Sequence, residues 1–228
     1  MIKVVCFDLF STLVDVGDVP LSVGRMTADI FGLEREQWNA LCFSAHHEIC
    51  RPTNAVDVIR TLIHSHNPHV DEELIQQAVC ERQNRFSYAL KEHIQADVLD
   101  GIRRLKQQGY ILILVSNAST AEVHGWSDSP LAHYFEHSVF SCAVGLKKPD
   151  SAIYNHACKL VSVQPQECLF VGDGGSDELI GAKNFGMQTL LMTRFLKKNK
   201  ALRQKAFADV IDGEVDSTSA VLDWLSRY

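Results

Sequence analysis

The chain has 228 residues, a formal net charge of −6 and 46% hydrophobic residues, which is ordinary for a soluble globular protein. The acidic balance argues against a nucleic-acid surface. The basic run Lys197-Lys198-Asn199-Lys200 is too short to reverse it and is interpreted as a solvated loop. No apolar run approaches the roughly 18 residues of a membrane helix. Seven cysteines without a CxxC pair are typical of a reducing compartment, so we expect a cytoplasmic protein. We expect neither a membrane nor a nucleic acid as a partner. The sequence does not indicate the oligomeric state.

Short apolar runs recur along the chain and predict buried strands. Most are continuous and rich in β-branched residues, which is typical of strands covered on both faces. The expected strands are Ile2–Phe7, Tyr110–Val115, His137–Phe140, Cys168–Val171, Thr189–Met192 and Ala208–Ile211. Helical patterns accompany the later strands at 97–108, 151–161, 176–186 and 217–227. This alternation predicts an α/β fold with a doubly wound parallel sheet.

One long stretch, between the first and second expected strands, contains helical patterns only. They lie at 20–31, 35–50, 54–65 and 71–91. We therefore predict an all-helical unit at 15–94, inserted into a core formed by 1–14 and 95–228. Trp38, Phe43 and Phe86 lie at helical spacing in this unit and are expected in its apolar core.

Polar residues gather where four of the expected strands end or lead into a helix. The four stretches are Asp8-Leu9-Phe10-Ser11-Thr12, Ser116-Asn117, Gly145-Leu146-Lys147-Lys148-Pro149-Asp150 and Gly172-Asp173-Gly174-Gly175-Ser176-Asp177-Glu178. Each alone is compatible with an ordinary turn, helix cap or solvated side chain. Ligands bind outside the carboxyl ends of the strands in an open parallel sheet, so the four together predict one site.

In this order the four stretches resemble the motifs of the haloacid dehalogenase superfamily of aspartate-nucleophile hydrolases, in its helical-cap form. "FDLFSTL" is similar to the first motif, "ILILVSN" to the second, "GLKKPDSAIY" to the third and "FVGDGGSDELIGAKNFGM" to the fourth. The resemblance covers essentially the whole chain. It implies a Rossmann-like catalytic core at 1–14 and 95–228, and it makes 15–94 the helical cap domain.

The resemblance also implies roles for individual residues. Asp8 is expected to attack the phosphorus of a small phosphorylated metabolite and to form an aspartyl-phosphate. A Mg²⁺ ion held by Asp8, the backbone oxygen of Phe10, Asp173 and a second acid would neutralise the repulsion between the carboxylate and the phosphate oxygens. Both Asp177 and Glu178 qualify as that second acid, and we favour Asp177 because its side chain is shorter. The remaining expected site residues are Ser116 and Lys148 as catalytic residues and Thr12 and Asn117 as substrate-binding residues.

Phe10 departs from the pattern of phosphatases in this superfamily, which usually carry a second aspartate at this position to protonate the leaving group. General acid catalysis is typically worth about 10²–10⁴-fold. The dehalogenases of the superfamily carry an aromatic residue at this place, because halide needs no proton. A metal-independent 2-haloacid dehalogenase is therefore the alternative, and a non-catalytic phosphate-binding or regulatory protein is a further one. Asp173 favours the Mg²⁺-dependent phosphatase, because a carboxylate there would repel an anionic haloacid unless a cation lies between them.

Overall fold

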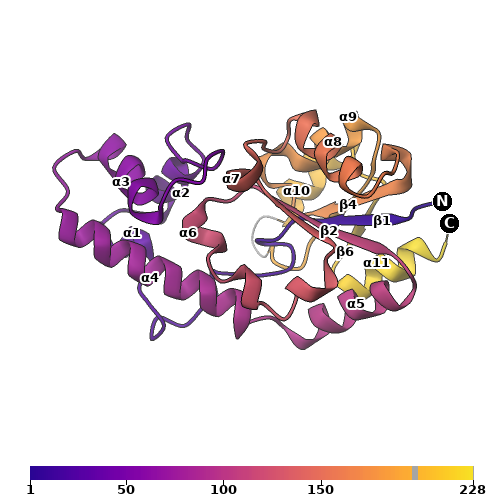
Figure 1. Ribbon diagram of the computed structural model, residues 1–228, viewed down its shortest axis with the longest axis horizontal. Coiled ribbons are helices and arrows are strands. Elements are labelled where there is room, and N and C mark those ends of the chain that lie inside the picture. The colour runs from indigo at the N-terminus through magenta and orange to yellow at the C-terminus, as the bar shows by residue number, and fades with distance from the viewer. Residues whose placement is uncertain (197–199, 228) are drawn as a thin grey trace.

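The computed structural model describes residues 1–196 and 200–227 (Figure 1). Six strands form one parallel sheet in the order β3-β2-β1-β4-β5-β6. The strands are β1 (Val4–Phe7), β2 (Ile111–Ser116), β3 (His137–Phe140), β4 (Cys168–Gly172), β5 (Gln188–Met192) and β6 (Gly213–Val215). The predicted Rossmann-like α/β fold is confirmed. Most of the expected basic loop, residues 197–199, lies outside the described residues.

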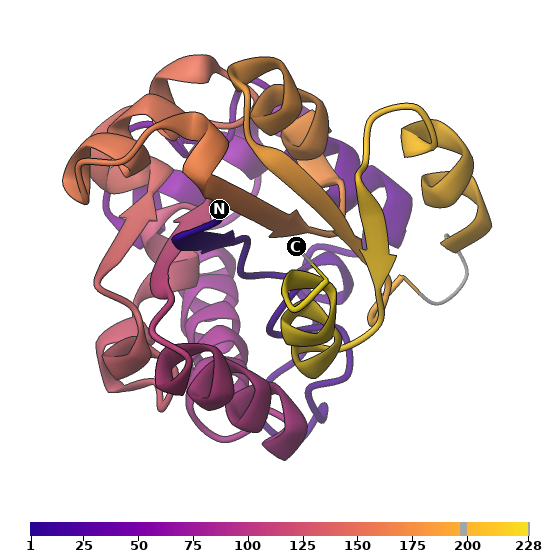
Figure 2. The same cartoon turned by 90° about the vertical axis from the view of Figure 1, so that its right-hand side faces the viewer.

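Helices cover both faces of the sheet, as Figures 1 and 2 show. Alternate residues of β1 belong to different apolar clusters: Val5 and Phe7 pack on one face, and Val4 and Cys6 on the other. The first face is covered by α5 (Ala96–Gln107) and α11 (Thr218–Leu225), and the second by α8 (Ser151–Leu160) and α9 (Glu178–Phe185). Burial on both faces explains why the strand sequences are continuously apolar.

The sixth strand does not lie where the sequence predicted it, at 208–211. The amides of Val210 and Ile211 both donate to the carbonyl of Phe207, so this stretch is a turn, and the strand follows at Gly213–Val215. Both side chains still pack against the apolar cluster, which explains the misleading apolar pattern. Short helices that the sequence did not predict are α6 (Thr120–Val123), α7 (Ser141–Val144), α10 (Lys200–Phe207) and the 3₁₀ helices Trp126–Asp128, Ala132–Tyr134 and Pro165–Glu167. The helix predicted at 176–186 is a 3₁₀ turn at Gly175–Asp177 followed by α9.

The helical segment between β1 and α5 stands to one side of the sheet in Figure 1. Its helices are α1 (Thr27–Ile30), α2 (Arg35–Cys42), α3 (Ala55–His66) and α4 (Glu72–Lys91). They share an apolar cluster of their own, which contains Trp38, Ile59, Leu62 and Ile75. Nowhere in the described residues does a helix combine the length and the apolar character needed to cross a membrane.

The first two helices of this segment are shorter than the sequence predicted, at 20–31 and 35–50. Arg85 of α4 explains the first difference, because its guanidinium donates to the carbonyls of Val16 and Gly24 at 3.0 and 2.8 Å. These carbonyls are therefore satisfied by a side chain instead of by helical amides. Beyond α2 the backbone turns, and Phe43 is 75% exposed, so the prediction that it lies in the apolar core is wrong.

A buried ion pair joins the helical segment to the sheet domain. Arg82 of α4 donates from Nη2 to Oε1 of Glu122 in α6 at 2.5 Å, and both residues are under 9% exposed. The backbone amide of Ser119 donates to Glu122 Oε2 at 2.8 Å. Burial by itself would raise the pKa of Glu122, but Arg82 and His47 outweigh it and hold that pKa below its ordinary value.

We expect Glu122→Gln to lower the free energy of unfolding by about 3–5 kcal/mol, because Arg82 would keep a buried charge without its partner. Since the pKa of Glu122 is lowered by folding, its contribution is fully present above the carboxyl's ordinary pKa of about 4.3 and is lost as the pH falls through the folded value. Urea unfolding at a series of pH values measures this. The gap between wild type and variant should narrow below about pH 4. A gap that does not change with pH would contradict the ion pair between an ionised Glu122 and Arg82.

Glu72→Gln, at an exposed carboxylate paired with Arg60, is the control and should have a much smaller effect on the free energy of unfolding.

Candidate active site

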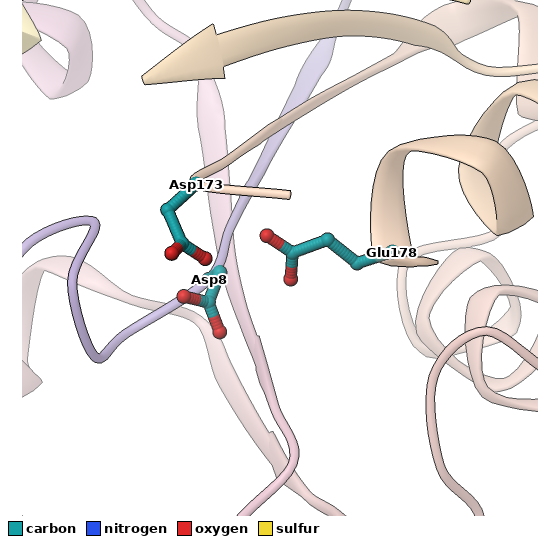
Figure 3. Close-up of side chains that lie close together, drawn as sticks. All are labelled: Asp8, Asp173 and Glu178. Carbon is teal, nitrogen blue, oxygen red and sulfur yellow. The ribbon is translucent and has the colours of Figure 1, made fainter. Parts of the chain in front are cut away.

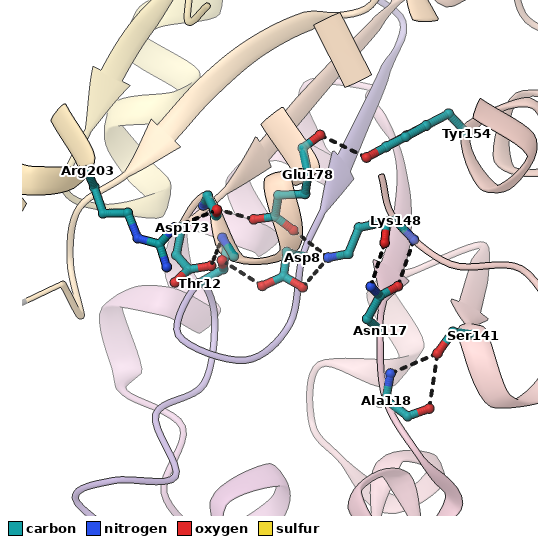
Figure 4. Close-up of polar contacts among 12 residues, drawn as sticks. Asp8, Thr12, Asn117, Ala118, Ser141, Lys148, Tyr154, Asp173, Glu178 and Arg203 are labelled. Carbon is teal, nitrogen blue, oxygen red and sulfur yellow. Dashed lines mark hydrogen bonds and ion pairs between the residues drawn. The ribbon is translucent and has the colours of Figure 1, made fainter. Parts of the chain in front are cut away.

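Asp8 follows the last residue of β1 and is only 6% exposed. The chain turns sharply after it: Ser11 has a φ of +62°, and the amides of Leu13 and Val14 both donate to the carbonyl of Leu9. This turn brings Thr12 back to the carboxylate, where its Oγ1 donates to Asp8 Oδ2 at 2.9 Å (Figure 4). The position of Asp8 is thus set by the strand on one side and by this turn on the other.

Lys148 is the cation nearest to this carboxylate among the described contacts. Its Nζ donates to Asp8 Oδ1 at 2.6 Å and also to Glu178 Oε2, and the residue is 3% exposed. Asn117 fixes the backbone of Lys148 from both sides, since its Nδ2 donates to the lysine carbonyl at 2.9 Å and its Oδ1 accepts from the lysine amide at 2.8 Å (Figure 4). Burial lowers the pKa of Lys148, but Asp8 and Glu178 outweigh it and raise that pKa above its ordinary value, so the lysine is charged.

Three carboxylates meet at the carboxyl ends of β1 and β4. One oxygen from each of Asp8, Asp173 and Glu178 lies within 4.8 Å of the others (Figure 3). Burial and the neighbouring Asp8 raise the pKa of Asp173 above its ordinary value, and they raise that of Glu178 well above it. Lys148 compensates only part of this charge. The cluster therefore has an excess of negative charge that favours a cation.

Glu178, and not the favoured Asp177, is the second acid that the structure brings to this cluster. Ser176 and Asp177 both have left-handed backbone angles, with φ of 53° and 51°, so the loop turns before α9 begins. Glu178 then reaches back, and its Oε1 accepts from the amide of Gly174 at 3.0 Å. A Cβ on Gly172 would lie 2.1 Å from Glu178 Oε1, so a glycine is needed there for this approach. Asp177 instead lines the cavity described below.

The other expected site residues lie at the same edge of the sheet. Ser116 ends β2, and its buried Oγ has no hydrogen-bond partner among the described residues, which leaves it available to an oxygen of a ligand. Thr12 and Asn117, which we expected to bind substrate, have side chains that contact Asp8 and the backbone of Lys148. The structure thus places them where they orient the two central groups.

Two residues near the cluster were not predicted. Arg203 of α10 donates from Nη1 to the carbonyl of Gly174 at 2.8 Å, and the hydroxyl of Tyr154 donates to the carbonyl of Glu178 at 2.8 Å (Figure 4). Both hold the loop that carries Asp173 and Glu178. Tyr154 lies within the third motif, so the sequence could have indicated that it is near the site. Arg203 lies on a helix that the sequence pattern did not indicate.

A cavity of about 900 Å³ opens between the helical segment and the sheet domain. Phe10, Asn117 and Lys148 line it from the sheet domain, and Arg82 and Phe86 of α4 line it from the other side. The arrangement has a buried nucleophile with a cation beside it, an acidic cluster and a free hydroxyl, next to room for a small molecule. These groups can support nucleophilic attack by a carboxylate on an electrophilic centre.

Comparison with known proteins agrees with this geometry. The family model of haloacid dehalogenase-like hydrolases matches residues 2–186. The glyceraldehyde 3-phosphate phosphatase of Pyrococcus furiosus is 28% identical to this chain, in an alignment that covers 97% of this chain and 93% of that protein. Phosphoglycolate phosphatase 1 of Pseudomonas aeruginosa is 27% identical over 217 residues, covering 92% and 76% respectively. The crystal structure of 2-haloacid dehalogenase from Pseudomonas syringae pv. Tomato DC3000 superposes with a TM-score of 0.68 at 22% identity, over 100% of this chain and 99% of that one, which shows the shared fold.

Proposed function

The chain belongs to the haloacid dehalogenase-like hydrolase family, and we propose that it is a Mg²⁺-dependent phosphatase that acts on a small phosphorylated metabolite with Asp8 as nucleophile. The observation that carries this proposal is the convergence of Asp8, Asp173 and Glu178 beside Lys148. Relatives named as phosphatases that span most of this chain support the same chemistry.

The acidic cluster fits Mg²⁺, because three carboxylates offer the hard oxygen ligands that this ion prefers. Asp8, Asp173 and Glu178 would hold the ion, with the backbone oxygen of Phe10 as a further proposed ligand. When bound, the ion would supply positive charge against the phosphate oxygens that Asp8 has to approach. The raised pKa values of Asp173 and Glu178 show how poorly the protein alone compensates these charges.

The residues of the chain have separate tasks in the proposed reaction. Thr12 and Lys148 hold the carboxylate of Asp8 while one of its oxygens forms a bond to phosphorus. The bond from phosphorus to the leaving oxygen breaks, and its electron pair stays on that oxygen. Lys148 and the free hydroxyl of Ser116 bind phosphate oxygens. Water then attacks the phosphorus of the aspartyl-phosphate, which releases phosphate and restores Asp8.

Removal of the metal tests this proposal against the dehalogenase alternative, which Phe10 favours. We expect phosphate release from a phosphate ester to stop in EDTA and to return with added Mg²⁺. Release of halide from 2-chloropropionate should be absent in EDTA, because Asp173 and Glu178 would repel the substrate carboxylate when no cation lies between them. Halide release that continues in EDTA would contradict the proposal and support the dehalogenase.

Two variants test which acid, Asp177 or Glu178, binds the ion. We expect Glu178→Gln to lower the affinity for Mg²⁺ by at least about tenfold, because substitution even of residues that only support a metal ligand typically costs about 10–100-fold. Asp177→Asn is the matched control and should leave the affinity nearly unchanged, because Asp177 is not in the carboxylate cluster. Titration calorimetry with Mg²⁺ measures both. A loss confined to Asp177→Asn would mean that the loop binds the ion in another conformation.

A further inference from the structure

We propose that the cavity wall on the helical segment is a subsite for an aromatic leaving group, so that the substrate is an aryl phosphate monoester. The inference rests on the proposed function and names its substrate class. Four aromatic side chains line this one cavity: Phe10, Trp38, Phe43 and Phe86.

The apolar wall begins directly beside the nucleophile. Phe10 lies two residues after Asp8, and its ring meets that of Phe86 edge to face, with centroids 5.1 Å apart. Phe10 and Lys148 line the same cavity, so a phosphate group held near Lys148 would direct its leaving group along these rings. An apolar leaving group gains contact with these two rings, whereas the hydroxyls of a sugar or polyol would find no hydrogen-bond partner on them.

The next part of the wall combines two aromatic rings with an arginine whose charge is balanced by a carboxylate. The guanidinium of Arg82 lies over the ring of Phe86 at 4.5 Å and near that of Trp38 at 5.7 Å. Its charge is paired with Glu122. Because this cation already has a buried partner, it does not call for a second anionic group on the substrate. Aromatic rings in a cavity wall suit the face or edge of an aromatic ring on the ligand.

Phe43 is a further aromatic residue that lines this cavity. It follows the last residue of α2 and is 75% exposed, so it has contact area to offer to a ligand. The volume of about 900 Å³ is near the upper end of the range of about 300–1,000 Å³ found for small-molecule sites. A phosphate with two or three carbons would leave most of it empty, whereas one or two fused rings would fill it better.

Binding of two phosphonates, which cannot be hydrolysed, tests the subsite apart from turnover. We expect 2-naphthylmethylphosphonate to bind the Mg²⁺-loaded protein at least about tenfold more tightly than methylphosphonate. Phe43→Ala should weaken binding of the naphthyl compound by about two- to tenfold, the range of one aromatic contact, and leave methylphosphonate unchanged. Leu202→Ala is the matched control: Leu202 is 70% exposed but does not line the cavity, so neither affinity should change. Calorimetry measures the affinity of each of the three proteins for both compounds.

Turnover of two esters separates ring contact from leaving-group acidity. 2-Naphthol and hexafluoroisopropanol have similar acidity, so their phosphates differ mainly in the ring. We expect a lower KM for 2-naphthyl phosphate and similar kcat values. Equal KM values and equal phosphonate affinities would overturn the aryl subsite and leave the phosphatase proposal intact. Failure of both phosphonates to bind, with no Mg²⁺-dependent release of phosphate from either ester, would contradict both.

Discussion

Lys148→Ala should lower kcat by about 10²–10³-fold, the cost of removing one positioned charge from a phosphate-binding site. The ammonium group is buried, and it donates to Asp8 at 2.6 Å and to Glu178. Its loss would leave three carboxylates close together with less compensation, so that Asp8 would both be misplaced and meet greater repulsion from the phosphate. Steady-state kinetics on a phosphate ester with saturating Mg²⁺ measures the effect.

Lys147→Ala provides the matched control for this variant. Lys147 carries the same charge one residue earlier, but it is exposed and forms no ion pair among the described residues. Its removal should leave kcat nearly unchanged. Circular dichroism and thermal unfolding show whether Lys148→Ala is folded under the assay conditions. A large loss in Lys147→Ala with normal turnover in Lys148→Ala would mean that the loop presents the other lysine to the substrate.

The second large effect concerns the missing acid at position 10. Because Phe10 has no proton to give, the leaving oxygen must depart as an anion, and rates should fall steeply as the leaving alcohol becomes less acidic. Phenyl phosphates with graded ring substituents keep the size of the leaving group nearly constant while its acidity changes. kcat across this series measures the dependence. Rates that do not vary would show that another group supplies the proton.

Phe10→Asp should flatten this dependence by helping the least acidic leaving groups most. A general acid is typically worth about 10²–10⁴-fold, but we expect the gain at the low end of this range. The site around Phe10 is shaped for a ring that packs on Phe86, so a carboxyl there would be poorly aligned with the leaving oxygen. Phe10→Asn has nearly the same shape and no acidic proton. A gain of equal size in both variants would mean that relief of crowding, and not protonation, causes it.

Much of the fold could be predicted because the strands are buried on both faces and therefore continuously apolar. The same reasoning failed at 208–211, where Val210 and Ile211 reach the apolar cluster from a turn. An apolar pattern indicates burial, and burial alone does not distinguish a short strand from a turn. The helix predicted at 20–31 is absent for a tertiary reason, because Arg85 of α4 satisfies the carbonyl of Gly24 in that stretch.

The central residues of the site could be predicted because the ends of parallel strands meet at one edge of the sheet. Asp8, Lys148 and Asp173 lie there together. The choice between Asp177 and Glu178 could not be made from side-chain length, because left-handed backbone angles at Asp177 and the residue before it decide which carboxylate turns inward. The left-handed region is unfavourable for residues other than glycine and gives little signal in a sequence.

¹⁹F NMR of the protein with beryllium fluoride and Mg²⁺ reports directly on whether Asp8 is a nucleophile. Beryllium fluoride binds an aspartate nucleophile as a stand-in for its phosphoryl group. We expect bound fluoride resonances for the wild-type protein that require Mg²⁺ and are absent in Asp8→Asn. No bound resonance in the wild type, or one that persists in Asp8→Asn, would contradict the assignment of Asp8 as the nucleophile of a Mg²⁺-dependent phosphatase.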